Sequence, residues 1–118
     1  MAGMVIPLRG DIFWVNLDPT VGSEIRKKRP AVIISNDAAN KRYDQVTVIP
    51  LTSQKLDAVE PFQVFLSAED SGLSKDSKAL AEQIRTVSKR RLESRAGRIN
   101  TIFMAKLEAA LKIHLDLE

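Results

Sequence analysis

Short apolar runs, many of them β-branched and bounded by turn-forming residues, occupy most of the chain. Apolar and polar positions alternate from Asp11 to Leu17, and Pro30 precedes the continuous run Ala31–Ile34. Such runs are too short for a helix and are typical of strands. Further segments with this character are residues 46–51, 62–66, 78–81 and 84–88. We therefore predict that most of the chain forms short strands.

Proline and turn-forming residues delimit these strands. Pro50 lies inside one apolar run, and because proline cannot donate to a sheet ladder, it predicts an edge position or a bulge there. Residues 36–40 and 67–76 are polar or contain glycine, and we predict that both form turns or irregular links.

The hydrophobic period changes near the end of the chain. From Asn100 or Thr101, either of which is a suitable N-cap, apolar residues recur every three or four positions up to Leu117. This spacing predicts one amphipathic helix. Short strands followed by a single helix favour a compact antiparallel barrel or sandwich. We predict a mainly β fold with helices (α+β), in one domain that comprises residues 1–118.

The inventory of reactive side chains excludes several kinds of chemistry. The chain has no Cys and one His, His114, which we expect in the core or in an interface because it falls on the apolar helix face. Thiol catalysis, thiolate zinc sites and a Ser/His/Asp triad are thereby excluded. The carboxylates lack the spacing of a calcium loop, and no glycine-rich phosphate loop is present. We expect neither a metal nor a cofactor.

Positive charge is clustered although the net charge is only +3. Residues 26–29 are four consecutive cations, and residues 85–98 hold six cations with Glu93 as their only acid. Such clusters suit a polyanion such as nucleic acid, although either run alone is more typical of a solvated surface. The apolar run Met4–Ile6 is too short for a signal peptide or a membrane span. We expect a cytoplasmic protein without membrane contact.

Arg29 and Thr52 occupy complementary places around two predicted strands. Arg29 precedes the strand at 31–34, and Thr52 follows the strand at 46–51. If these strands are antiparallel neighbours, the two residues lie at the same edge of the sheet. An arginine beside a hydroxyl can hold a phosphate and stabilise charge during phosphoryl transfer. Taken singly, Arg29 is better explained as the partner of an acid in an ion pair, and Thr52 as a β-forming residue that ends a strand.

Five segments in this order and spacing resemble the MazF/PemK/Kid family of toxins. They are Arg9–Val15 (RGDIFWV), Asp18–Glu24 (DPTVGSE), Arg29–Asn36 (RPAVIISN), Val48–Ser53 (VIPLTS) and Glu82–Val87 (EQIRTV). The resemblance implies an SH3-like antiparallel barrel with a C-terminal helix, a homodimer, and RNA bound in a groove along the dimer interface. It also implies the toxin of a type II toxin–antitoxin system, with a MazE-like antitoxin whose acidic C-terminal segment occupies the RNA site.

The activity implied by the resemblance is that of an mRNA interferase. Such endoribonucleases cut single-stranded RNA at a short sequence without metal, through attack by a ribose 2′-hydroxyl, and leave 2′,3′-cyclic phosphate and 5′-hydroxyl ends. Among the family motifs, the catalytic arginine falls on Arg29 and the catalytic threonine on Thr52. Since a guanidinium stays protonated in proteins, we assign Arg29 to electrostatic stabilisation.

Further site residues follow from the same resemblance. Glu24 and Ser53 are expected to support catalysis. The residues expected to bind RNA are Arg26, Lys27, Lys28, Gln54, Gln83 and Arg85. This chain departs from many relatives between Glu24 and Arg29, where it has bulky and basic residues in place of glycine.

Two other functions fit the same sequence. One is a gyrase-poisoning toxin of the CcdB type, which resembles this fold and would act through its C-terminal residues. The other is a non-catalytic RNA-binding barrel, whose binding would be sensitive to salt.

Overall fold

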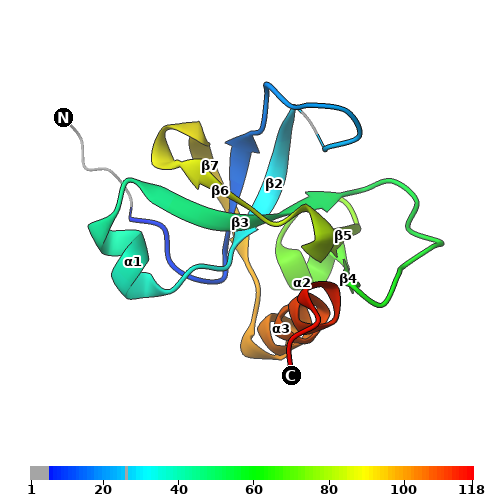
Figure 1. The fold of residues 1–118 in the computed structure, drawn as a ribbon. Coiled ribbons are helices and arrows are strands. Elements are labelled where there is room, and N and C mark those ends of the chain that lie inside the picture. The colour runs from blue at the N-terminus through cyan, green and yellow to red at the C-terminus, as the bar shows by residue number, and fades with distance from the viewer. Residues whose placement is uncertain (1–5, 26) are drawn as a thin grey trace.

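The computed structural model describes residues 6–25 and 27–118, so the predicted RNA contact Arg26 lies outside the described residues. It contains an antiparallel sheet with strand order β4-β5-β3-β2-β1-β7, in which β6 also pairs with β3 (Figure 1). The strands are β1 (Asp11–Asn16), β2 (Lys28–Ile33), β3 (Gln45–Thr52), β4 (Gln63–Leu66), β5 (Ser77–Leu80), β6 (Arg85–Ser88) and β7 (Leu92–Arg98). The helical segments are α1 (Asp37–Arg42), α2 (Ala68–Ser71), η1 (Ala81–Gln83), η2 (Lys89–Arg91) and α3 (Thr101–Leu115). The predicted α+β fold is confirmed.

The central strands are buried on both faces. In β3, Val46 and Val48 belong to one core cluster, whereas Ile49 and Leu51 belong to a second cluster that also includes Leu107 of α3. Because successive side chains of a strand point to opposite faces, the sheet separates two cores. This double burial explains why the run 31–34 is continuously apolar instead of alternating.

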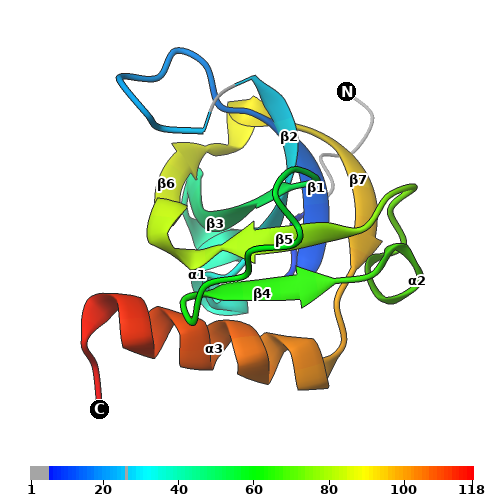
Figure 2. The same cartoon turned by 90° about the vertical axis from the view of Figure 1, so that its right-hand side faces the viewer.

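The two ends of the strand order approach each other through α2. This helix follows β4 and lies beside β7 (Figure 2). A Cβ atom added to Gly97 of β7 would lie 2.1 Å from the carbonyl oxygen of Ser71. Only glycine permits this approach, which brings the terminal strands of the curved sheet together as in a barrel.

The terminal helix α3 is confirmed and lies against β4 and η1. The Asn100 side chain caps it by accepting a hydrogen bond from the Phe103 backbone N at 2.9 Å. Met104, Leu107 and Ala110 are buried on its inner face. His114 is exposed and its ring centroid lies 6.2 Å from that of Phe62, so it is not in the core of the chain, and its predicted place in an interface stays a prediction. None of the helices in the described ranges is long and apolar enough to cross a membrane.

Some predicted links and edges differ from the observed elements. Helices α1 and α2 and strand β7 replace segments that we predicted as turns or left unassigned, because they are short and lack a regular apolar period. Pro50 is not at an edge, since it pairs with Ala31 of β2. On its other side β3 pairs with β6 up to Val48 and with β5 from Leu51. Pro50 therefore lies where β3 changes its pairing from β6 to β5. No hydrogen bond of either ladder requires an N–H group at this position.

Candidate active site

Three strands bring the candidate residues to one edge of the sheet. Strands β2 and β3 are antiparallel with Ala31 opposite Pro50, and the same register continued by two residues sets Arg29 opposite Thr52. Thr52 is in turn paired with Lys78 of β5. The sequence separations within this edge are large, so it exists only in the folded sheet.

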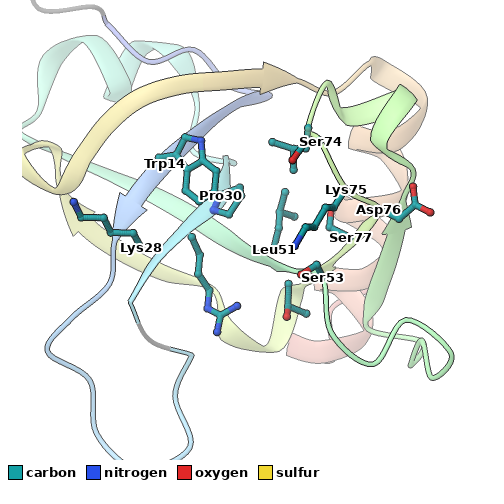
Figure 3. Close-up of a pocket in the computed structure, with 12 residues that line it drawn as sticks. Trp14, Lys28, Pro30, Leu51, Ser53, Ser74, Lys75, Asp76 and Ser77 are labelled. Carbon is teal, nitrogen blue, oxygen red and sulfur yellow. The ribbon is translucent and has the colours of Figure 1, made fainter.

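Arg29 and Thr52 line the same pocket, which has a volume of about 270 Å³. Apolar side chains form much of its wall, and Figure 3 shows Trp14 beside Pro30 with Leu51 across the pocket from them. The other lining residues are Lys28, Ser53, Leu73, Ser74, Lys75, Asp76 and Ser77. The pocket thus combines an apolar surface, on which a base could pack, with groups that bind phosphate.

The charged side chains around the pocket differ in their availability to a ligand. Lys28 forms an ion pair with Glu93, with 3.1 Å between Nζ and Oε2, and both side chains are exposed. Lys75 points into the pocket, whereas Asp76 points away from it (Figure 3). Asp76 instead accepts a hydrogen bond from the backbone N of Ala68 at 2.8 Å. Lys75 therefore adds a positive charge to the pocket that Arg29 also lines, which suits an anion.

The Thr52 hydroxyl has a defined orientation. Its Oγ1 accepts a hydrogen bond from the backbone N of Gln54 at 3.2 Å. A hydroxyl that accepts in this way keeps its own proton to donate to a ligand. Gln54 thus contributes through its backbone, and its side chain does not line the pocket.

A buried lysine holds the loop that follows Thr52. The side chain of Lys78 is almost fully buried, and its Nζ donates to the carbonyl oxygens of Lys55 at 3.0 Å and Ala58 at 2.6 Å. Ala58 N also donates to the Lys55 carbonyl, which closes a tight turn. Lys78 was not predicted as a site residue, since only the β3–β5 pairing brings it near this loop.

Four of the predicted residues hold the loop between β1 and β2 and lie outside the pocket lining. Glu24 Oε1 accepts from the backbone N of Val21 at 2.8 Å, and Lys27 N donates to an Asp18 carboxylate oxygen at 3.0 Å. From the β6 side, Gln83 Oε1 accepts from Ile25 N at 3.4 Å, and the Arg85 guanidinium donates to the Leu17 carbonyl at 3.2 Å. These contacts shape the loop that leads to Arg29.

Lys75 and Ser77 line the pocket and were missed from the sequence. Ser77 is 3% exposed, and its Oγ is buried without a hydrogen-bond partner in the described part of the chain. Both residues lie at or before β5, far in sequence from Arg29 and Thr52, and neither belongs to a local motif. Knowledge of the β3–β5 pairing would have been needed to find them.

Metal ligands do not cluster in the described residues. Residues 6–25 and 27–118 contain no group of three or more His, Asp or Glu side chains placed to hold an ion. The metal-free mechanism stays a prediction, and an assay in the presence of a chelator tests it.

Comparisons with known proteins agree on one family. The model of PemK-like, MazF-like toxins of type II toxin–antitoxin systems matches residues 8–115. Endoribonuclease MazF9 of Mycobacterium tuberculosis is 48% identical over 114 residues, which cover 92% of this chain and 96% of the relative. Endoribonuclease EndoA of Bacillus subtilis is 37% identical over 113 residues, which cover 96% and 97%.

Solved structures agree with these sequence matches. The crystal structure of MazF from Deinococcus radiodurans has a TM-score of 0.84 and 26% identity, and the match covers 97% of this chain and 100% of that one. A mycobacterial endoribonuclease in complex with its cognate antitoxin has a TM-score of 0.76 and 26% identity, with 98% of each chain covered. The chain therefore belongs to the family of PemK-like, MazF-like toxins of type II toxin–antitoxin systems.

Proposed function

We propose that this toxin, an endoribonuclease like its named relatives, cleaves single-stranded messenger RNA at a short sequence without a metal ion. The observation that carries the proposal is the joint presence of Arg29 and Thr52 in one pocket, at the ends of neighbouring antiparallel strands. The apolar wall beside them suits an unstacked base, which is how proteins read single-stranded RNA. Because messenger RNA is the proposed substrate, the proposed place of action is the cytoplasm.

The proposed reaction is an internal transesterification. The ribose 2′-oxygen attacks the adjacent phosphorus while the bond from phosphorus to the 5′-oxygen breaks. The 2′-hydroxyl loses a proton and the leaving oxygen gains one, so the products are a 2′,3′-cyclic phosphate and a 5′-hydroxyl. Negative charge develops on the non-bridging oxygens of the phosphate, which the Arg29 guanidinium and the Thr52 hydroxyl are proposed to bind.

The remaining candidates have supporting roles in this proposal. Ser53 and Lys28 line the pocket and are proposed to contact the RNA backbone. Glu24, Lys27, Gln83 and Arg85 are proposed to act through the loop that they hold, which sets the approach of Arg29.

We also propose two protein partners. The first is an antitoxin whose acidic segment competes with RNA for the positive pocket, supported by the solved complex of a mycobacterial relative with its own antitoxin. The second is another copy of this chain, supported by apolar side chains that are exposed on the described fold near α3, among them Phe65 at 43% and Ile113 at 55%. Sedimentation of the purified protein measures the oligomeric state directly.

The test is incubation of the purified protein with a long single-stranded RNA in EDTA, followed by mapping of the product ends. We expect discrete cuts with 5′-hydroxyl ends. Arg29→Ala should lower the rate by about 10² to 10³, which corresponds to about 3–4 kcal/mol of transition-state stabilisation. Thr52→Val keeps the shape of the side chain and removes the hydroxyl, and we expect a smaller loss that still exceeds tenfold, about 1.4 kcal/mol.

A matched control separates the pocket from general charge. Arg42→Ala removes one positive charge from the exposed end of α1, which lies outside the pocket lining. We expect its rate to stay within about threefold of the wild type, since exposed charges act mainly through screened long-range fields. Equal losses in both arginine variants would refute the role of Arg29. Intact RNA with the wild type would instead direct attention to a gyrase-poisoning toxin or a binding module.

A further inference from the structure

We propose that Ser77 reads a base of the RNA substrate, as a specificity-determining residue in the same pocket as Arg29 and Thr52. This inference rests on the proposed ribonuclease function and deepens it. Its basis is the contrast between the burial of the Ser77 hydroxyl and the lack of a hydrogen-bond partner for it.

A buried hydroxyl without a partner is unfavourable for folding. Ser77 is 3% exposed, and its Oγ finds neither a backbone nor a side-chain partner in the described part of the chain. Most buried polar groups in proteins are hydrogen-bonded, and an unsatisfied one destabilises the fold. Alanine would fit the same space without that cost. The serine is therefore better explained by a ligand that supplies the missing partner than by the stability of the free protein.

The position of Ser77 determines what that ligand is. Ser77 lines the pocket together with Leu51 and Leu73, which are apolar, and with Thr52. Figure 3 places Ser77 on the side of the pocket across from Trp14 and Pro30. A phosphate held at Arg29 and Thr52 would put the attached nucleoside against this apolar surface. Ser77 then faces the nucleoside and not the phosphate.

The neighbouring lysine favours one kind of base. Lys75 points into the same pocket, and an ammonium group can donate hydrogen bonds but cannot accept them. A base edge with a carbonyl oxygen, as in uracil or guanine, satisfies Lys75 and the Ser77 hydroxyl together. Adenine has no carbonyl oxygen, and each of its ring nitrogens has only one lone pair, so no single acceptor atom of adenine satisfies both donors. A site built to hydrogen-bond a substrate group rejects analogues that lack it, since its own polar groups then stay unpaired.

The experiment measures binding separately from cleavage. After the cut site is mapped, a short RNA with a 2′-deoxy nucleotide at the attacking position blocks cleavage while leaving the bases intact. The dissociation constant is measured for this RNA and for versions with each neighbouring base replaced in turn. Wild type, Ser77→Ala and Ser35→Ala are compared. The Ser35 hydroxyl is hydrogen-bonded to Asn40 and to the Thr47 backbone and lies outside the pocket lining, so it is the matched serine control.

We expect Ser77→Ala to bind the best RNA about fivefold to tenfold more weakly, as for the loss of one hydrogen bond. The loss should be confined to one base position, where the variant no longer distinguishes uracil or guanine from adenine. Its melting temperature should equal or exceed that of the wild type. Ser35→Ala should show the reverse, with a lower melting temperature and unchanged base discrimination.

Other outcomes overturn the inference in distinguishable ways. If the wild type cuts RNA while Ser77→Ala keeps the full base discrimination, Ser77 does not read a base and the ribonuclease assignment stands. A loss of affinity that is equal at every base position would show a backbone contact instead. If the wild type neither binds nor cuts the RNA, the proposed function fails and this inference fails with it.

Discussion

The closure of the sheet at Gly97 can be tested by a single methyl group. The Cβ of Gly97→Ala would lie 2.1 Å from the Ser71 carbonyl oxygen and 3.3 Å from its carbon. Carbon–oxygen contacts are comfortable from about 3.3 Å, so the backbone of α2 or β7 must move by about 1 Å. Gly97 does not have a positive φ, so alanine is not strained by its own backbone. The whole cost therefore comes from the clash.

The expected loss of stability follows from these opposing effects. Overpacking in a dense region costs about 1–3 kcal/mol, and the upper part of this range applies because the obstacle is backbone. Replacing glycine recovers about 0.4–1 kcal/mol through the unfolded chain. The net loss is then about 2 kcal/mol. For 118 residues the entropy of unfolding is about 0.25 kcal/mol/K, so the melting temperature should fall by about 8 °C.

Thermal unfolding followed by circular dichroism measures this shift. Ser94→Ala, at an exposed position of the same strand, is the control and should stay within about 0.5 kcal/mol, or 2 °C. A melting temperature for Gly97→Ala as close to the wild type as that of the control would refute the contact between α2 and β7. The reasoning about barrel closure would then be wrong.

Three further changes have defined outcomes. Asp11→Asn weakens the ionic contacts of a buried carboxylate with Arg95 at 3.1 Å and Arg98 at 2.7 Å, and we expect a loss of about 2 kcal/mol in urea unfolding. Asn100→Ala removes the cap of α3 and should cost about 1 kcal/mol by the same measurement; no loss would mean that solvent replaces the cap. Lys78→Met keeps the apolar stem and removes the Nζ group that donates two hydrogen bonds to the 55–58 turn. Amide hydrogen exchange should therefore accelerate in residues 53–60 and not in α3.

The sequence predicted the elements whose residues carry a regular apolar pattern. The helix after Asn100 was predicted because burial of one face imposes a period of three to four residues on it. The strand at Asp11–Asn16 was predicted from alternation, which Phe13 and Val15 follow in one core although Ile12 is also buried, in the other core. Strand β7 was missed because its sequence, LESRAGR, is mostly polar and exposed. It is a strand because β1 supplies hydrogen-bond partners, which lie 77 to 87 residues away along the chain.

The residues of the candidate site also divide into those that the sequence could predict and those that depend on strand pairing. Arg29 and Thr52 could be proposed as neighbours because both flank predicted strands, and one assumption about antiparallel pairing sets them together. Ser77 and Lys75 could not be proposed, because their place depends on which strand pairs with the end of β3. Arg85 carries a charge that suits RNA, and Glu24 carries a carboxylate that suits support of catalysis, yet both bond to nearby backbone. Composition alone does not distinguish these uses of a charged side chain.

The change of partner along β3 divides its amide protons between two units of local opening. The amides of Val46 and Val48 face β6, whereas the amide of Thr52 faces β5, and Pro50 between them has no amide proton. Opening of the β4–β5 pair would expose the Thr52 amide without breaking the pairing with β6, because protein regions open in cooperative units. Hydrogen exchange would then report one free energy of opening before the proline and another after it. Thr52 would exchange with the second unit, so the pocket lies across the boundary between the two.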